Sequence, residues 1–303
     1  MKKNIFLAVV FLVLGFSLFA AGTNEKQIDI YYSASLNGNL DGCECKSNPR
    51  SGLVKRAVYL RNIDKNSSVI LETVDIFDVY PDELLSDYIL KSYLELGYDA
   101  IAVGDQEFSN GISYLLERIT KYPFLGNNLS IKTENGNLVS VSKKPLIISK
   151  KGVDVAVLSI IDPEVFRFYP VDITESIEIM NPSNFISLFL SSPETKKADL
   201  RLLLFHGSLE NVRQIALKNP SLDIIIAGHE QQTVDGEMIG NTILVSPGGE
   251  GNMLGHLKVV SDGKELIFDN SFIKFDYMTD SDDPLIRERI NEYTKKMTEK
   301  LMK

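Results

Sequence analysis

Short hydrophobic runs typical of β-strands alternate with amphipathic segments along most of the chain. The strand-like runs are residues 28–35, 68–75, 100–107, 152–161, 199–207, 222–230 and 241–249. The amphipathic segments between them include residues 54–63, 81–97 and 210–219. This alternation predicts a layered α/β fold.

The last part of the chain has a different pattern. Residues 257–268 read as a β-hairpin, with Asp262-Gly263 at its turn. Pro284 then opens an amphipathic helix. Its apolar stripe comprises Ile286, Ile290, Tyr293, Met297 and Leu301. A helix of this kind either packs on the domain that precedes it or leads toward a second domain, and the pattern leaves both open.

The first residues differ from the rest in being almost wholly apolar. Lys2 and Lys3 precede an apolar run, residues 5–19, which ends in small residues. This run is shorter than the ~20 residues that a membrane-spanning helix prefers. Residues 1–21 therefore predict a cleaved secretory signal, with no membrane span in the mature chain and a periplasmic or secreted location. An uncleaved anchor is the alternative.

Composition narrows the class of partner. With 44% hydrophobic residues and about 280 residues beyond the predicted signal, the chain can bury a sizeable core. Its net charge of -9, without a dense basic run, argues against nucleic acid or an anionic membrane as the main partner. A small anionic or phosphorylated ligand stays compatible with this charge, and nothing in the composition indicates a protein partner.

Two cysteines, Cys43 and Cys45, are separated by a single residue. A disulfide between them would close almost no loop, so it would restrict the unfolded chain very little. The functional interpretation is that the pair takes part in thiol redox chemistry or binds a soft metal. The alternative is an inert, exposed pair that is oxidised after export.

Polar side chains able to bind a metal recur where the predicted strands end. They are Ser35, Asn37, Asp75, Asp105, His206 and His229. A single strand-end Asp is usually a turn or helix cap, and a single His is usually a packing residue. Ligands of layered α/β folds bind beyond the carboxyl ends of strands, however. Carboxylates and imidazoles delivered there together predict a divalent metal centre.

The order of these motifs resembles the calcineurin-like metallophosphoesterases, specifically the catalytic domain of the periplasmic 5'-nucleotidases and UDP-sugar hydrolases, the UshA-like proteins. The family pattern contains, in order, NDxHG, GGLAR, GD, GNHE, ANI, SHxG and GHxH segments. The corresponding stretches here are "SASLNGNL", "SGLVKRA", "TVDIFD", "LGYDAIAVGDQEFSNG", "FLGNNL", "LFHGS" and "AGHEQQT". The similarity covers about residues 28–300, and its most specific part is residues 96–111.

The resemblance implies a particular architecture. We expect a four-layer α/β/β/α sandwich with two mixed central sheets over residues 28–280. Residues 281–303 are then a C-terminal helix that would lead into the family's nucleotide-binding domain, which we expect to be absent. The cysteines also resemble a UshA-like branch that carries cysteine or selenocysteine in this loop.

The resemblance also implies a ligand set. The family's first metal site maps onto Ser35, Asn37, Asp75 and Gln231, where three of the four ligands are replaced by a hydroxyl or an amide. The second site maps onto Asp75, Asp105, His206 and His229, all of which can bind a metal. We therefore expect one divalent ion, Zn, Mn or Fe, instead of two.

The same mapping bears on activity. The histidine that assists the family's chemistry is Gln106 here, and glutamine neither donates a proton nor changes charge near pH 7. We expect phosphoester hydrolysis that is weak, altered or absent, and no catalytic residue is assigned. Three hypotheses stay open: a one-metal hydrolase, a non-catalytic binding protein on the same scaffold, and a thiol-based redox protein.

Overall fold

The computed structural model describes residues 25–45, 49–261 and 265–302. The predicted signal, residues 1–21, and the predicted turn at Asp262-Gly263 lie outside the described residues. The helices are α1 (Gly52–Arg61), α2 (Glu83–Leu96), α3 (Ile112–Arg118), α4 (Val171–Thr174), α5 (Pro182–Ser191), α6 (Pro193–Lys197), α7 (Leu209–Lys218) and α8 (Pro284–Leu301), with 3₁₀ turns η1 (Gln106–Phe108) and η2 (Pro163–Phe166). The strands are β1 (Lys26–Ser33), β2 (Ser68–Glu72), β3 (Ala100–Ala102), β4 (Phe124–Leu125), β5 (Leu129–Lys132), β6 (Leu138–Ser140), β7 (Leu146–Lys150), β8 (Val153–Ile161), β9 (Ile177–Ile179), β10 (Leu200–Gly207), β11 (Ile224–His229), β12 (Thr233–Ile239), β13 (Thr242–Pro247), β14 (Met253–Ser261) and β15 (Leu266–Lys274).

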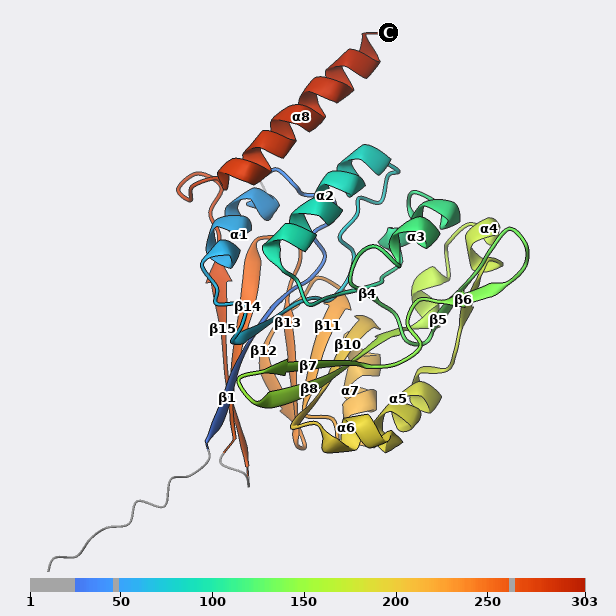
Figure 1. Ribbon diagram of the computed structural model, residues 1–303, viewed down its shortest axis with the longest axis vertical. Coiled ribbons are helices and arrows are strands. Elements are labelled where there is room, and N and C mark those ends of the chain that lie inside the picture. Colours follow the sequence, from blue (N-terminus) through green and yellow to red (C-terminus); the bar gives the residue numbers. More distant parts are fainter. Residues whose placement is uncertain (1–24, 46–48, 262–264, 303) are drawn as a thin grey trace, which may run out of the picture.

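Two six-stranded mixed sheets form the centre of the molecule (Figure 1). The first has the order β15-β14-β1-β2-β3-β4, in which β1 to β4 run parallel, β14 pairs antiparallel with β1, and β15 pairs antiparallel with β14. The second has the order β12-β13-β11-β10-β8-β7, with a parallel centre and an antiparallel strand at each edge. The parallel strands of each sheet therefore bring their carboxyl ends to one edge.

The core is divided into three apolar layers by the sheets. In β8, Val155 and Val157 belong to a cluster between the two sheets, whereas Ala156 and Leu158 pack with α5 and α7 on the outer face. Strands alternate their side chains between two faces, so a continuous hydrophobic run is what a strand covered on both sides requires. A third cluster joins the first sheet to α1, α2, α3 and α8. The predicted four-layer α/β/β/α sandwich is confirmed.

The boundaries of α2 follow from local chemistry. The side chain of Asp82 accepts a 2.9 Å hydrogen bond from the backbone N–H of Leu85, which caps the helix at its start. Gly97 has a φ of 77°, the left-handed conformation that ends many helices. The helix expected over residues 81–97 is therefore present.

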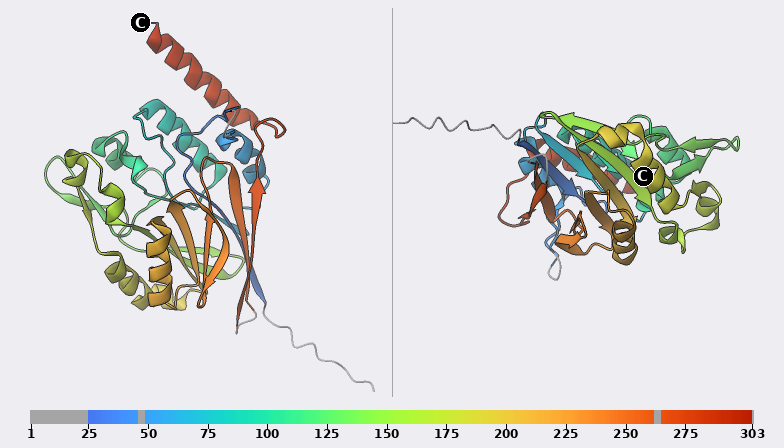
Figure 2. Two further views of the ribbon diagram at one scale, coloured as in Figure 1. Left: turned by 180° about the vertical axis from the view of Figure 1, so that it is seen from behind. Right: turned by 90° about the horizontal axis from the view of Figure 1, so that it is seen from below.

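The C-terminal helix α8 contacts the domain from Ile286 to Lys296, whose Nζ donates a 2.8 Å hydrogen bond to the hydroxyl of Tyr88. Ile286 and Ile290 are buried, and Tyr293 donates a 2.7 Å hydrogen bond to Asp82. Leu301 is 82% exposed. Both figures show the end of α8 extending away from the sheets (Figures 1 and 2). Within the described residues, no helix combines the length and the apolar character needed to cross a membrane.

Residues 108–151 and 162–198 contain elements for which the sequence pattern gave no expectation. They include α3, the short α4, and a small sheet of order β6-β5-β9. These elements are short, so they show too few turns or alternations for a period to be recognised.

Candidate metal centre

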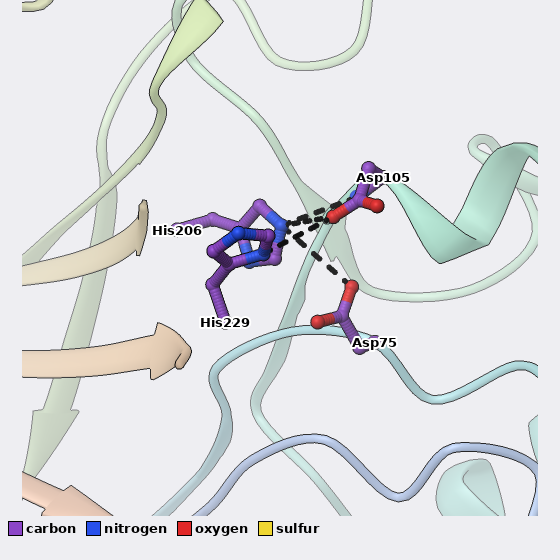
Figure 3. A group of neighbouring side chains, drawn as sticks. All are labelled: Asp75, Asp105, His206 and His229. Carbon is purple, nitrogen blue, oxygen red and sulfur yellow. Dashed lines mark hydrogen bonds and ion pairs between the residues drawn. The ribbon is translucent and has the colours of Figure 1, made fainter. Parts of the chain in front are cut away.

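Four side chains converge where the two central sheets meet at the carboxyl ends of their parallel strands (Figure 3). Asp75 follows β2 and Asp105 follows β3, both in the first sheet. His206 lies near the end of β10, and His229 is the last residue of β11, both in the second sheet. One ligand atom from each of the four lies within 4.8 Å of all the others. Each sheet thus provides half of the cluster.

Asp105 lies at the centre of the interactions. Its Oδ1 forms a short hydrogen bond with Nε2 of His206 and lies 3.5 Å from Nδ1 of His229. Nε2 of His206 also lies 3.7 Å from Oδ1 of Asp75. Carboxylate oxygens and imidazole nitrogens aimed at a common point suit Zn, Mn or Fe, so the donor set fits a divalent ion.

The two carboxylates occupy different electrostatic environments. Burial raises the pKa of Asp75 well above its ordinary value, and repulsion by Asp105 and Glu107 adds to this. Burial also acts on Asp105, but hydrogen bonds from His206 and His229 outweigh it and lower the pKa of that carboxyl. Crowded buried carboxylates of this kind are relieved when a cation binds between them.

The two imidazoles also differ. Burial lowers the pKa of His206, which is 1% exposed, so this ring is neutral near pH 7 and can offer a lone pair. The hydrogen bond with Asp105 raises the pKa of His229, whose side chain is 35% exposed. His229 therefore forms the solvent-facing side of the cluster.

The backbone conformation around the cluster brings the loops that carry the four side chains close to one another. Asp75 and His229 have φ of 57° and 82°, a left-handed conformation that is unusual for residues with side chains. Gly104 precedes Asp105, and a β-carbon there would lie 2.4 Å from Oδ1 of Asp75. Only glycine lets the chain after β3 pass this close to the carboxylate.

Two supporting residues were missed by the sequence reasoning. Glu107 is fully buried and accepts hydrogen bonds from the backbone N–H groups of Gly104 at 2.6 Å and Ile76 at 2.8 Å. Burial raises the pKa of Glu107 to about 7. Tyr169 donates a 2.6 Å hydrogen bond to Oδ2 of Asp105. Glu107 could have been noticed as an acid two residues after Asp105, but Tyr169 lies in a segment without a recognisable motif.

Two residues expected to replace first-site ligands, Ser35 and Asn37, lie next to Asp75 along the chain's backbone hydrogen bonds. The backbone N–H of Ser35 bonds to Val74 at 2.7 Å, and that of Asn37 bonds to Asp75 at 2.9 Å. Ser35, Asn37 and Gln231 all have left-handed φ, of 49°, 51° and 54°. Ser35 Oγ and Asn37 Oδ1 are buried and have no hydrogen-bond partner among the described residues.

Gln106 sits on the other side of the Asp75 carboxylate. Its backbone N–H lies 3.5 Å from Oδ1 of Asp75, and its own Oε1 is buried without a hydrogen-bond partner in the described part of the chain. The side chain of Gln231 lies against Gly249, where a β-carbon would be 2.6 Å from Gln231 Oε1. These amides offer neutral oxygens where the family pattern has imidazoles.

The cysteines are joined to each other. Cys43 and Cys45 form a disulfide in the loop between β1 and α1. Paired backbone hydrogen bonds between Cys43 and Arg50, of 2.8 and 2.9 Å, close this loop, and Arg50 forms an ion pair with Glu250. Neither cysteine belongs to the four-residue cluster.

Known proteins similar to this chain include 5'-nucleotidases. A snake venom 5'-nucleotidase of Gloydius brevicauda is 25% identical over 232 residues, which are 71% of this chain and 37% of that protein. Protein UshA of Escherichia coli (strain K12) is 26% identical over 156 residues, 46% of this chain and 28% of that protein. The chain thus matches about a third of the length of these curated relatives. No protein-family model matches it.

A solved structure shares the fold over almost the whole chain. The calcineurin-like phosphoesterase YfkN of Bacillus subtilis superposes with a TM-score of 0.70 at 16% identity, covering 92% of this chain and 100% of that one. At this identity the likeness concerns the fold alone.

Proposed function

This chain belongs to the UshA-like metallophosphoesterase family, and we propose that it is an exported, 5'-nucleotidase-like member that binds one divalent ion and acts on phosphoesters weakly, with altered specificity, or not at all. The observation that carries the proposal is the convergence of Asp75, Asp105, His206 and His229, whose ligand atoms lie within 4.8 Å of one another. The ion would be Zn, Mn or Fe.

Each residue of the cluster has a distinct part in this proposal. His206, neutral and buried, offers its Nε2, while Asp105 is fixed by Tyr169 so that Oδ1 faces the histidines. Asp75 faces the positions of the family's first site. A divalent ion held here would supply positive charge for a phosphoryl oxygen and lower the pKa of a bound water. His229 is the member nearest solvent, so a ligand would approach beside it.

The degenerate positions are the reason to expect impaired hydrolysis. Ser35, Asn37 and Gln231 carry no charge, so the first site lacks the ligands that would hold a second ion. Paired ions hold the attacking and the leaving oxygen of a phosphoryl transfer together, and one ion cannot do both. Gln106 offers no acid to a leaving group.

The experiment is elemental analysis of the purified mature protein. We expect about one equivalent of metal, retained in Cys43→Ser and lost in His206→Ala. Because His206 is buried, His229→Ala serves as a second variant whose folding is at less risk. Absence of metal in the wild type, even after reconstitution, overturns the proposal. A screen of phosphoesters follows if metal is present.

A second candidate is a non-catalytic binding protein that uses the same edge of the sheets. The buried, unpartnered Ser35 Oγ and Asn37 Oδ1 favour it, because they could bond to a small phosphorylated ligand in place of the missing ion. Under this alternative, Asp75→Asn keeps ligand binding, whereas hydrolysis by the one-metal enzyme is lost in that variant.

The third candidate is thiol-based redox chemistry, which the disulfide between Cys43 and Cys45 favours. Cys45 is exposed, so a reductant could reach it. The redox activity would disappear in the Cys→Ser variants and would persist after removal of metal. Thiol titration before and after mild reduction detects this chemistry directly.

The proposed export and domain limits can be tested together. We propose a signal over residues 1–21, a metallophosphoesterase-like domain over 28–280, and a C-terminal helix over 281–303. The mature protein would be periplasmic or secreted and free of a membrane span. N-terminal sequencing of protein recovered from outside the cytoplasm should begin near residue 22, and an intact Met1 would contradict export by cleavage.

A further inference from the structure

A pocket of about 410 Å³ opens beside the metal cluster. It lies between the loop after β2, the η1 turn, and the segment that joins η2 to α4. The lining combines the apolar side chains of Val79, Phe108, Phe168 and Pro170 with the polar side chains of Ser109, Tyr169 and Asp172. Its size falls in the range of about 300–1,000 Å³ that small-molecule sites occupy.

The pocket is continuous with the cluster through one side chain. Tyr169 lines the pocket, and its hydroxyl donates the 2.6 Å hydrogen bond to Oδ2 of Asp105. Two other lining residues come from the loops that carry the carboxylates: Val79 follows Asp75, and Phe108 follows Asp105. A ligand seated in the pocket would therefore have its polar end at the cluster.

One wall of the pocket is a rigid aromatic stack. Phe166 packs edge-on against Phe108 at 5.4 Å between ring centroids and against Tyr169 at 5.1 Å. Phe108 is only 2% exposed. Edge-to-face packing of this kind fixes ring orientation and presents a preformed surface to a ligand.

Two further lining side chains are exposed. Phe168 is 90% exposed and Val79 is 60% exposed. The Arg167 guanidinium lies 5.3 Å from the ring centroid of Phe168, within cation–π range. The hydroxyl Oγ of Ser109 is buried at the pocket and has no hydrogen-bond partner among the described residues. An exposed ring that lines the same pocket as a preformed aromatic surface is suited to cover a planar apolar group.

We propose that this pocket binds the aromatic group of a phosphoester whose phosphate lies at the metal cluster. The inference rests on the proposed function and adds a class of substrate to it. The recognition surface is provided entirely by the domain that carries the cluster. Phe168 covers one face of the bound ring, and the Phe108–Tyr169 wall packs against its edge or other face.

The test compares two non-hydrolysable probes on the manganese-loaded protein by calorimetry. Phenylphosphonate and methylphosphonate present the same anion, but only the first has a ring. We expect phenylphosphonate to bind about tenfold more tightly. Phe168→Ala should weaken phenylphosphonate about fivefold and leave methylphosphonate unchanged. Since Phe168 is exposed, this variant should fold normally.

Leu217→Ala is the matched control, because Leu217 is an exposed apolar side chain (63%) on α7 and does not line the pocket. Equal affinities for both probes, with no effect of Phe168→Ala, overturn the aromatic pocket and leave the metal site standing. Manganese binding without affinity for either phosphonate overturns the phosphoester function and the pocket together. Failure to bind manganese is detected separately in the metal titration.

Discussion

The carboxylate of Glu107 accepts a 2.8 Å hydrogen bond from the backbone N–H of Ile76, a residue on the neighbouring loop. Its other oxygen accepts from Gly104 at 2.6 Å. One buried side chain therefore ties the loop that carries Asp75 to the loop that carries Asp105. The spacing of the two candidate carboxylate ligands depends on this tie.

Removing the tie should weaken metal binding without removing a ligand. We expect Glu107→Ala to lower divalent-metal affinity by about tenfold or more, the usual cost of losing a supporting contact to a metal site. Glu107→Gln keeps an acceptor oxygen and should lose less. Competitive titration with a chelating indicator measures both, and equal affinities in Glu107→Ala and wild type would contradict the assigned role.

Glycine at position 104 should also be required. A β-carbon there would lie 2.4 Å from Oδ1 of Asp75 and 3.1 Å from Cε1 of His206. Gly104→Ala should therefore displace both side chains, reduce metal affinity, and lower the free energy of unfolding by about 1–3 kcal/mol. In Gly126→Ala the nearest atom is 3.2 Å away, on the side chain of Val141, so this control should be milder. Thermal unfolding with and without metal distinguishes the two variants.

A buried ion pair stabilises the first sheet. Arg56 and Glu72 are both inaccessible to solvent, with Nη2 of Arg56 3.6 Å from Oε2 of Glu72. Tyr93 donates a 2.8 Å hydrogen bond to the same oxygen. Arg56→Met should cost about 3–5 kcal/mol of stability, because it leaves the carboxylate buried without its cation.

The double variant Arg56→Met with Glu72→Gln separates charge from packing in this network. It removes both charges and should recover part of the lost stability, measured by urea denaturation. A double variant no more stable than Arg56→Met alone would mean that the hydrogen bonds of Tyr93, and not the charge balance, dominate.

The attachment of α8 should depend on pH. Asp283 accepts hydrogen bonds from the backbone N–H of Ile286 at 3.0 Å and from Nη2 of Arg61 at 3.0 Å. Burial opposes ionisation, but these bonds outweigh it and lower the pKa of Asp283 below its ordinary 3.8. The stability from this carboxylate is therefore present above about pH 4 and is lost as the pH falls through the lowered folded-state pKa.

Asp283→Asn keeps a helix cap but removes the charge. We expect it to cost about 1 kcal/mol at pH 7, because Arg61 is partly exposed, and to reduce the acid dependence of unfolding below pH 4. Asp269→Asn on β15 is the control. An unchanged acid dependence in Asp283→Asn would assign the acid sensitivity of the fold to other carboxylates.

The four residues of the cluster could be predicted because the end of a strand can be recognised from the end of its hydrophobic run. Asp75, Asp105, His206 and His229 each follow or end a hydrophobic run, and parallel strands must bring such ends to one edge. That reasoning needs only the period of each strand and the order of the strands.

Other parts of the site leave no periodic signal. Tyr169 and Phe168 lie between η2 and α4, in a segment whose conformation is set by tertiary packing. In the sequence, Glu107 cannot be distinguished from a surface glutamate, because its role depends on backbone hydrogen bonds from Gly104 and Ile76. The short elements over residues 108–151 and 162–198 were missed for the same reason. A strand such as β3, with three residues, is positioned by its neighbours more than by its own propensity.

Because the cluster is divided between the two central sheets, an ion bound by all four residues would cross-link one sheet to the other. Asp75 and Asp105 belong to the first sheet and His206 and His229 to the second, so neither half can open while all four remain bound. Amide hydrogens of β2 and β10 should then exchange with solvent as a single cooperative unit in the loaded protein. After removal of the ion by a chelator, the amide hydrogens of the two sheets should exchange at independent rates.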